Sequence, residues 1–331
     1  MLTKKQNLLE TIHGGNPDRF VNQYEFIHIF MSDPYNASDP APKYGQVNVT
    51  NKWGITKSWP EGAPGAFPVL DEEHRVLKDI DDWKKVIKAP KLVFSESSWE
   101  PAIKEVEGVD RNEQFVAPFV APGLFERLHY LMGMEDAMVN FYEEPEEVKE
   151  LIKYITEWEL EYADLLCSHL HPDALFHHDD WGSQKSTFFS KEMFEEFFVD
   201  AYKEIYGYYK NHGVELVVHH SDSYAEPFVP DMIDIGIDIW QGVMATNNIP
   251  EMIRKYGGKI SFMGGINSAT VDHPGWTREE IAKEVQRVCT EYGKDKHYYI
   301  PNIIQGLPVS TFEGVYETTS EEIDKMSKEM F

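Results

Sequence analysis

Short apolar runs that end in polar clusters alternate with helical patterns along this chain, and this alternation restricts its fold more than any other feature. Residues 214–218 are mostly apolar and lead into the sequence His-His-Ser-Asp at 219–222. A short helical pattern then ends at Gly236, and a second apolar run reaches Trp240. A strand, loop, helix and strand in this order are typical of a parallel sheet whose chemistry lies at the carboxyl ends of the strands. The sequence therefore predicts an α/β fold.

The same alternation recurs on both sides of this step. An apolar run at 174–176 precedes a second polar cluster, His-His-Asp-Asp-Trp-Gly at 177–182. Further helices are predicted from Pro145, over 191–210, from Pro250 and from the capping box at Thr277, and further strands at 20–29, 237–240, 260–263 and 298–300.

The absence of a Gly-rich phosphate motif after an early strand favours a closed barrel over a dinucleotide-binding sheet. We therefore predict a single (β/α)8 TIM barrel domain over residues 1–331. The segment from Ser32 to Pro68 is rich in Pro, Gly and Asn and shows no sustained period. It is predicted to be an extended, irregular N-terminal segment that serves as a lid or wall, or else to contain short strands that the sequence does not resolve.

Composition excludes several classes of partner. Asp and Glu outnumber Lys and Arg by 57 to 31, for a formal charge of −26, so neither nucleic acid nor an anionic membrane is an expected partner. The two cysteines, Cys167 and Cys289, lie in helical patterns and predict buried thiols in a reducing compartment. No apolar signal segment follows Met1, and no uncharged stretch reaches about 18 residues. A cytoplasmic location is predicted.

Four motifs in the second half of the chain carry a family resemblance. They are Asp-Asp-Trp-Gly-Ser-Gln at 179–184, His-His-Ser-Asp at 219–222, the run from Pro230 to Asp238, and Gly-Gly-Ile-Asn at 264–267. In this order they resemble the uroporphyrinogen decarboxylase superfamily, over roughly residues 115–330. The resemblance implies a (β/α)8 barrel and an enzyme, because the superfamily contains decarboxylases and corrinoid-dependent methyltransferases.

The chain departs from two branches of that superfamily at their functional positions. The decarboxylases carry an arginine-rich N-terminal segment that holds the substrate's carboxylates, whereas residues 20–27 here read Phe-Val-Asn-Gln-Tyr-Glu-Phe-Ile. The methyltransferases that act on coenzyme M carry His-x-Cys and a second cysteine. Here Asp222 replaces the first cysteine and Gln305 falls where the second is expected. A thiolate-rich zinc site is therefore not expected.

The resemblance leaves the substrate-side methyltransferases of anaerobes, which demethylate small methylated compounds. It implies that this chain moves a methyl group from such a substrate, with a methoxy-aromatic favoured (O-demethylation), to the cobalamin of a partner corrinoid protein. An ether is a poor methyl donor, so zinc or an acid is expected to stabilise the leaving oxygen. The alternative is a decarboxylase or lyase acting on a smaller substrate, with Arg127 and Lys185 as its cations. A barrel that binds a small molecule without catalysis, and a homodimer, also remain open.

The predicted metal ligands lie at two strand ends. They are His178, His220 and Asp222, with Asp180 or Glu25 as further candidates, and together they offer nitrogen and oxygen donors that suit a Lewis-acidic zinc ion. The alternative is a hydrogen-bonded polar strand end without a metal. A second ligand spacing, Glu135, Glu150 and His171, resembles that of some ether demethylases, but the predicted helix and strand would keep these three groups apart.

The predicted catalytic residues are Asp179, Asp180 and His220. Either acid can donate a proton or orient the imidazole, and helix capping is the alternative for the pair. Because neighbouring residues of a strand face opposite sides, only one of His219 and His220 is expected in the site.

The predicted substrate-binding residues come from several segments, although most aromatic side chains of a globular protein belong to its core. They are Tyr24, Glu25, Trp53, Phe119, Trp181, Trp240 and Asn267.

Overall fold

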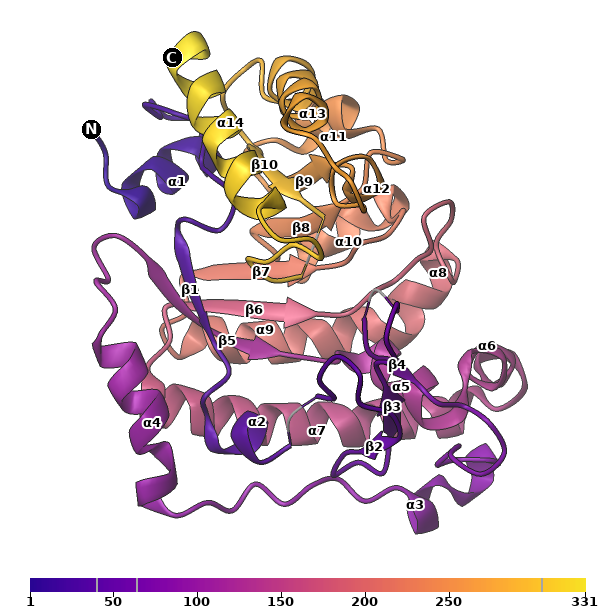
Figure 1. Cartoon of the computed structure of the whole chain (residues 1–331). Helices are drawn as coiled ribbons and strands as arrows, with labels where there is room; N and C mark the ends of the chain where they lie inside the picture. Colours follow the sequence, from indigo (N-terminus) through magenta and orange to yellow (C-terminus); the bar gives the residue numbers. More distant parts are fainter. Residues whose placement is uncertain (40, 64, 305) are drawn as a thin grey trace.

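Seven parallel strands form the main sheet of the computed structural model, which describes residues 1–39, 41–63, 65–304 and 306–331 (Figure 1). The strands are β1 (Ile27–Phe30), β5 (Phe115–Val120), β6 (Ala174–His178), β7 (Leu216–His220), β8 (Ile239–Val243), β9 (Ser261–Ile266) and β10 (Tyr299–Ile303). Their order in the sheet follows their order in the chain, and every pairing is parallel. The alternation of strands and helices in the sequence predicts this arrangement.

The sheet curls around a core that receives a side chain from each of its strands. One buried cluster contains Ile27, Phe115, Phe176, Val218, Ile239, Met263 and Ile300, together with Leu8 and Ile12 of the first helix. Residues that are neighbours of these in the strands face the other way and pack under the helices, as the period of two requires. Because all the strands share one inner cluster, the sheet must bend in the manner of a barrel wall.

The described residues contain seven parallel strands, whereas eight were predicted. The predicted strand over residues 20–29 shortens to β1, because residues 23–26 form a turn in which the Ile27 N–H donates to the Tyr24 carbonyl at 3.1 Å. In the described part of the chain no backbone ladder joins β10 to β1. The Gln23 side chain lies there instead and accepts from the Asn302 amide and the Ile303 N–H, each at 3.5 Å. The described residues thus show the α/β part of the prediction, with a curled, seven-stranded parallel sheet that resembles a barrel wall.

Most of the helices connect the strands and cover the outer face of the sheet, whereas the first helix packs against the inner cluster (Figure 1). They are α1 (Lys4–Ile12), α3 (Trp83–Val86), α4 (Glu96–Glu107), α5 (Leu124–Met132), α6 (Met134–Glu143), α7 (Pro145–Leu170), α8 (Lys191–Phe194), α9 (Asp200–Asn211), α10 (Val229–Asp234), α11 (Ile249–Tyr256), α12 (Ser268–Val271), α13 (Arg278–Glu291) and α14 (Val315–Met330). Pro145 opens α7 and Thr277 forms the capping box of α13, as predicted. A π-helical turn at Glu195–Val199 joins α8 to α9 within the predicted helix. Within the described residues, no helix has the length and apolarity needed to cross a bilayer.

The N-terminal segment contains a short helix beside α7 and a small sheet beside α5 (Figure 1). They are α2 (Pro34–Ser38) and a small antiparallel sheet of β2 (Val49–Thr50), β3 (Thr56–Ser58) and β4 (Phe67–Pro68). Trp53 and Ile55 of this segment are buried in the same core cluster as the helices. The segment is therefore packed as a wall over one end of the main sheet.

Candidate functional site

Polar side chains gather inside the curled sheet where the strands end. His178 ends β6, His220 ends β7 and Gln241 lies in β8, and these three residues are register partners across the neighbouring strands. They therefore lie at one level and face the same side of the sheet. His219, the neighbour of His220, faces the helices instead, where its ring stacks on Trp181 at 4.0 Å between centroids. Strand alternation predicts this division of the two imidazoles.

His178, His220 and Asp180 form a cluster that could hold a metal ion. One donor atom from each residue lies within 4.8 Å of the other two. The His220 Nε2 atom is 3.8 Å from the Asp180 Oδ1 atom, and the two imidazole rings stack with centroids 4.3 Å apart. Two imidazoles and one carboxylate, with a position left for substrate, are the donor set of many catalytic zinc sites.

The hydrogen bonds behind the two imidazoles suit metal binding. The Nδ1 atom of His178 lies 2.8 Å from the Glu126 carboxylate, and the Nδ1 atom of His220 bonds to the Gln241 side-chain oxygen. With Nδ1–H donating to these oxygens, each Nε2 atom keeps its lone pair for a metal. Gln241 is itself held, because its amide donates to the Asn302 Oδ1 atom at 2.9 Å. These residues fit a zinc ion.

The pair of Glu126 and His178 sets the charge at one side of the cluster. Burial opposes the charge of Glu126, but the His178 cation and the Tyr130 hydroxyl hold the pKa of Glu126 down at about 2. Burial likewise opposes the charge of His178, yet the Glu126 carboxylate raises the pKa of His178 to about 10. Without a metal, the two side chains therefore form an ion pair at neutral pH.

On the other side of the cluster, the pKa values of His220 and of two acids are shifted. Burial and the neighbouring His178 cation lower the pKa of His220 to about 4, so this imidazole is neutral, as a metal ligand must be. Burial raises the pKa of Asp180 to about 6. The protein around its carboxyl group and the Asp180 charge raise the pKa of Asp222 to about 7, although the residue as a whole is exposed at the rim of the cluster. Two acids with these pKa values can hold and release a proton near neutral pH.

A cavity of about 490 Å³ lies beside His178, between the barrel mouth and the N-terminal wall. Phe119 and Tyr35 give it aromatic faces, and Glu126, Tyr130 and Lys57 add polar groups. The ring of Phe119 meets the ring of His178 edge to face, with centroids 6.2 Å apart. This volume is within the range of pockets that hold small organic ligands.

Comparison with known proteins decides the family. Residues 52–325 match the family model described as "Uroporphyrinogen decarboxylase (URO-D)". The chain belongs to the uroporphyrinogen decarboxylase family. Its fold is similar to that of a protein described as "methyltransferase from Methanosarcina mazei", with 12% identity, a TM-score of 0.66, and coverage of 98% of this chain and 99% of that one. A D-allulose 3-epimerase from Methylomonas sp. shares 9% identity at a TM-score of 0.34, over 72% of this chain and 94% of that one. No curated protein sequence matches.

Membership of the uroporphyrinogen decarboxylase family extends the resemblance beyond the four motifs, since the match begins at residue 52. Both strand-end motifs contribute to the cluster. Asp222, a predicted metal ligand, is exposed at its rim, and its backbone N–H donates to the Asp180 Oδ1 atom at 2.9 Å. The three donor groups that lie close together are those of His178, His220 and Asp180, so Asp180 takes the place predicted for Asp222.

Asp179, a predicted catalytic residue, lies on the helix side of the sheet. Its carboxylate accepts the Phe125 N–H at 2.9 Å and the Glu126 N–H at 2.8 Å, and so caps the first turn of α5. It also accepts from the Trp181 indole at 3.2 Å and from the Tyr202 hydroxyl. Four donors satisfy this carboxylate. Its contacts match helix capping, which is the alternative role given above for Asp179 and Asp180.

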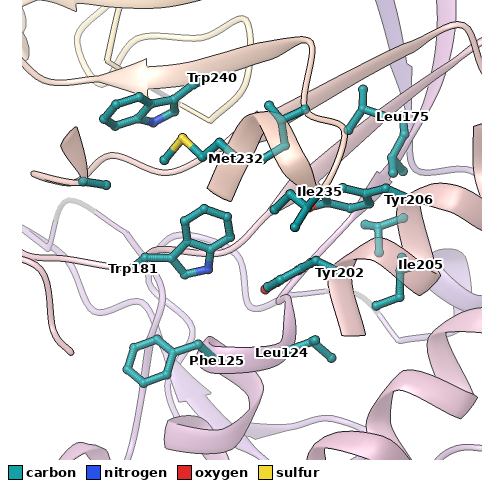
Figure 2. Packing of buried hydrophobic residues seen from close by; sticks show 14 of the residues in the cluster. Leu124, Phe125, Leu175, Trp181, Tyr202, Ile205, Tyr206, Met232, Ile235 and Trp240 are labelled. Atoms are coloured by element: carbon teal, nitrogen blue, oxygen red, sulfur yellow. The ribbon is translucent and has the colours of Figure 1, made fainter. Parts of the chain in front are cut away.

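The predicted substrate-binding residues divide between the cavity and the core. Phe119 lines the cavity. Trp181 and Trp240 are fully buried under the helices, where Figure 2 shows them among Phe125, Tyr202 and Met232. Their location corrects the prediction that they contact substrate, because bulky aromatic residues on the outer face of the sheet fill the space under the helices.

The remaining predicted residues also lie away from the cluster. Trp53 is buried behind the cavity wall, with its ring 4.6 Å from the Arg127 guanidinium. Tyr24 and Glu25 precede β1, so they lie at the amino ends of the strands, opposite the cluster. Asn267 is exposed and caps α12 by accepting the Ala269 N–H. None of these four contacts the metal cluster in the described part of the chain.

The alternative spacing does not converge either. Glu150 pairs with Lys84 on the surface of α7 at 2.6 Å, and His171 is the left-handed residue that ends this helix. Glu135 lies in the first turn of α6, a different helix. Gln305, which falls where a second cysteine of the coenzyme M branch is expected, lies outside the described residues.

Sequence reasoning missed several residues of the site. Gln241 and Asn302 interrupt apolar strands with an amide, and this signal was available in the sequence. Glu126 gave no such signal, because it reaches His178 from a helix that is distant in sequence. Gly306 was also missed. A Cβ atom there would lie 3.3 Å from the His178 ring and 3.5 Å from the His220 Nε2 atom.

Proposed function

We propose that this chain is the substrate-side component of a corrinoid-dependent methyl transfer. It moves the methyl group of a small methylated substrate, a methoxylated aromatic, to the cob(I)alamin of a separate corrinoid protein. The observation that carries the proposal is the cluster of His178, Asp180 and His220 beside a cavity with aromatic faces. Likeness of fold to a protein described as a methyltransferase supports the proposal over the full chain.

The chemistry requires help at the ether oxygen. Transfer of the methyl group to the partner's reduced corrinoid would break the C–O bond of the substrate, and the electron pair of that bond would stay on the oxygen. Zinc, when bound by His178, Asp180 and His220, would supply Lewis acidity at that oxygen. Asp222, whose pKa the surrounding protein and the Asp180 charge raise to about 7, can deliver the proton that converts the departing phenoxide to a phenol.

The corrinoid partner follows from the same chemistry. Cob(I)alamin must approach the methyl carbon in line with the departing oxygen, which requires close positioning of the two reactants. The cluster lies at the mouth of the curled sheet, so a corrinoid protein that covers this mouth can bring the cobalt within reach.

The test is a methyl-transfer assay. The purified chain is incubated with zinc, a reduced corrinoid protein and, in turn, methoxylated phenols and benzoates, methylamines and betaines, while the methylcobalamin spectrum is followed. We expect methylcobalamin from methoxylated aromatics, with the rate reduced by about a hundredfold or more in His220→Ala. Absence of methylcobalamin with every donor would overturn the proposal.

A decarboxylase or lyase remains the second candidate because Arg127 lines the cavity. Lys185, the other cation expected for that activity, is exposed in a turn and is not part of the cavity lining. Release of carbon dioxide from a small carboxylic acid, without methylcobalamin formation, would favour this second function.

A further inference from the structure

Lys57 is a cation of the cavity wall that has no acidic partner. It lies in β3 and lines the cavity together with Phe119, Tyr130 and His178. Its ammonium group is 4.3 Å from the centroid of the Tyr130 ring, a cation–π contact. Within residues 1–39, 41–63, 65–304 and 306–331, no carboxylate forms an ion pair or hydrogen bond with it.

The two carboxylates that line the same cavity are already engaged. Glu126 bonds to His178 at 2.8 Å and accepts from the Tyr130 hydroxyl at 2.5 Å. Asp39 accepts the Lys52 backbone N–H at 2.9 Å. Both lie near enough to influence the Lys57 charge, but neither contacts it.

Arg127, a second basic residue of the lining, is held in place by its surroundings. It donates to the Pro122 carbonyl at 2.8 Å, and its guanidinium lies 4.6 Å from the Trp53 ring and 5.1 Å from the Trp158 ring. The hydrogen bond satisfies one donor of the guanidinium, and the two ring contacts fix the orientation of its plane. Lys57 is therefore the cavity cation best able to receive a ligand.

An ammonium group without a counter-charge is costly where burial removes part of its hydration. Lys57 is partly buried, so its charged form loses part of its hydration, and this burial lowers its pKa. A carboxylate that enters the cavity would restore the lost interactions through charge-assisted hydrogen bonds. The aromatic faces of Phe119 and Tyr130 offer a surface for a ring attached to that carboxylate.

We propose that the cavity binds its substrate through an anionic substituent, a carboxylate that pairs with Lys57, with the ring of the substrate against Phe119 and Tyr130. The inference rests on the proposed function insofar as it names the methyl donor. An anion site at Lys57 would favour methoxylated aromatic carboxylates, such as methoxybenzoates, over neutral methoxylated phenols as substrates.

The test is a binding measurement that needs no methyl transfer. Calorimetric titration of the purified chain compares 3-methoxybenzoate with 3-methoxybenzamide, a neutral ligand of the same shape. We expect the carboxylate to bind more tightly by about tenfold to a hundredfold, and Lys57→Met to abolish this preference without changing the affinity for the amide. Lys57→Arg should keep part of the preference. Lys43→Met removes an exposed lysine of the same segment that does not line the cavity, and it should behave as the wild type.

The possible outcomes separate the two proposals. Equal binding of carboxylate and amide by the wild type, or an equal loss of both in Lys57→Met, would overturn the role of Lys57. Carboxylate binding that depends on Lys57, without methylcobalamin from any donor, would support the anion site and refute the methyl transfer. Methylcobalamin from neutral phenols alone, at a rate that Lys57→Met leaves unchanged, would refute the anion site and support the methyl transfer.

Discussion

At the scale of single residues, the site depends on which atom of each imidazole is free. Gln241 takes up the Nδ1 side of His220 and leaves Nε2 facing Asp180. For Gln241→Leu we expect zinc affinity to fall by about ten- to a hundredfold, because the ring loses the acceptor that fixes its tautomer and orientation. Competition with a zinc-binding dye measures this affinity. Gln241→Glu keeps an acceptor and should retain most of the affinity, and an equal loss in both variants would contradict the argument.

A second prediction concerns the ion pair of Glu126 and His178 in metal-free protein. The folded pKa of His178, about 10, exceeds its usual 6.5, so its contribution is complete below pH 6.5 and disappears as the pH rises toward 10. The folded pKa of Glu126, about 2, lies below its usual 4.5, so its contribution is complete above pH 4.5 and disappears as the pH falls toward 2. The pair therefore stabilises the fold most between these limits, at pH 4.5 to 6.5.

For Glu126→Gln we expect a loss of about 3 kcal/mol in the free energy of unfolding at pH 5.5, and a clearly smaller loss at pH 9. Urea unfolding in the presence of a chelator measures both values. Glu150→Gln, which removes a surface pair with Lys84, should cost less than about 1 kcal/mol and serves as the control. The same loss at both pH values for Glu126→Gln would exclude this ion pair.

At the scale of elements, the sequence predicts well which strand ends hold the polar residues of the site. It predicts less well which residues contact one another there. Period-two alternation correctly separates His220 from His219, because both lie in one regular strand. The same rule cannot predict Glu126 or Lys57, which reach the cavity from α5 and β3. Their positions depend on how the N-terminal wall packs, and no local periodicity encodes that packing. Trp181 and Trp240 were misplaced for a different reason, since they were chosen as aromatic residues and composition alone does not tell which side of a sheet an aromatic residue fills.

The turn after β10 offers a prediction at this scale. Gly306 lies over both imidazole rings, and a larger side chain there would occupy the space in front of the Nε2 atom of His220. We expect Gly306→Val to abolish zinc binding and methyl transfer while leaving the melting temperature within about 2 °C of the wild type. Gly207→Val, in a helix where an added Cβ meets no atom within 4 Å, is the control and should bind zinc normally. Normal zinc binding by Gly306→Val would show that the metal lies elsewhere.

At the scale of the whole molecule, the cluster exists only when distant segments are assembled. His178 and His220 come from neighbouring strands, but Glu126 and Gln241 approach from separate elements, so the unfolded chain cannot present the same donor set. Zinc should therefore bind the folded state preferentially and shift unfolding to higher temperature. At a free zinc concentration about a hundredfold above Kd, the linkage amounts to about 2.7 kcal/mol, or about 4 °C for a chain of this size.

Calorimetric melting with zinc and with a chelator tests this last prediction, and variants identify the acidic ligand. His220→Ala should abolish the shift. Asp180→Asn should abolish it as well, whereas Asp222→Asn should preserve most of it, because the described cluster contains Asp180 and leaves Asp222 at the exposed rim. A shift that survives Asp180→Asn and disappears in Asp222→Asn would exchange the roles of the two acids. Proton release on zinc binding should accompany the shift, because His178 must lose the proton that Glu126 holds on it in the metal-free protein.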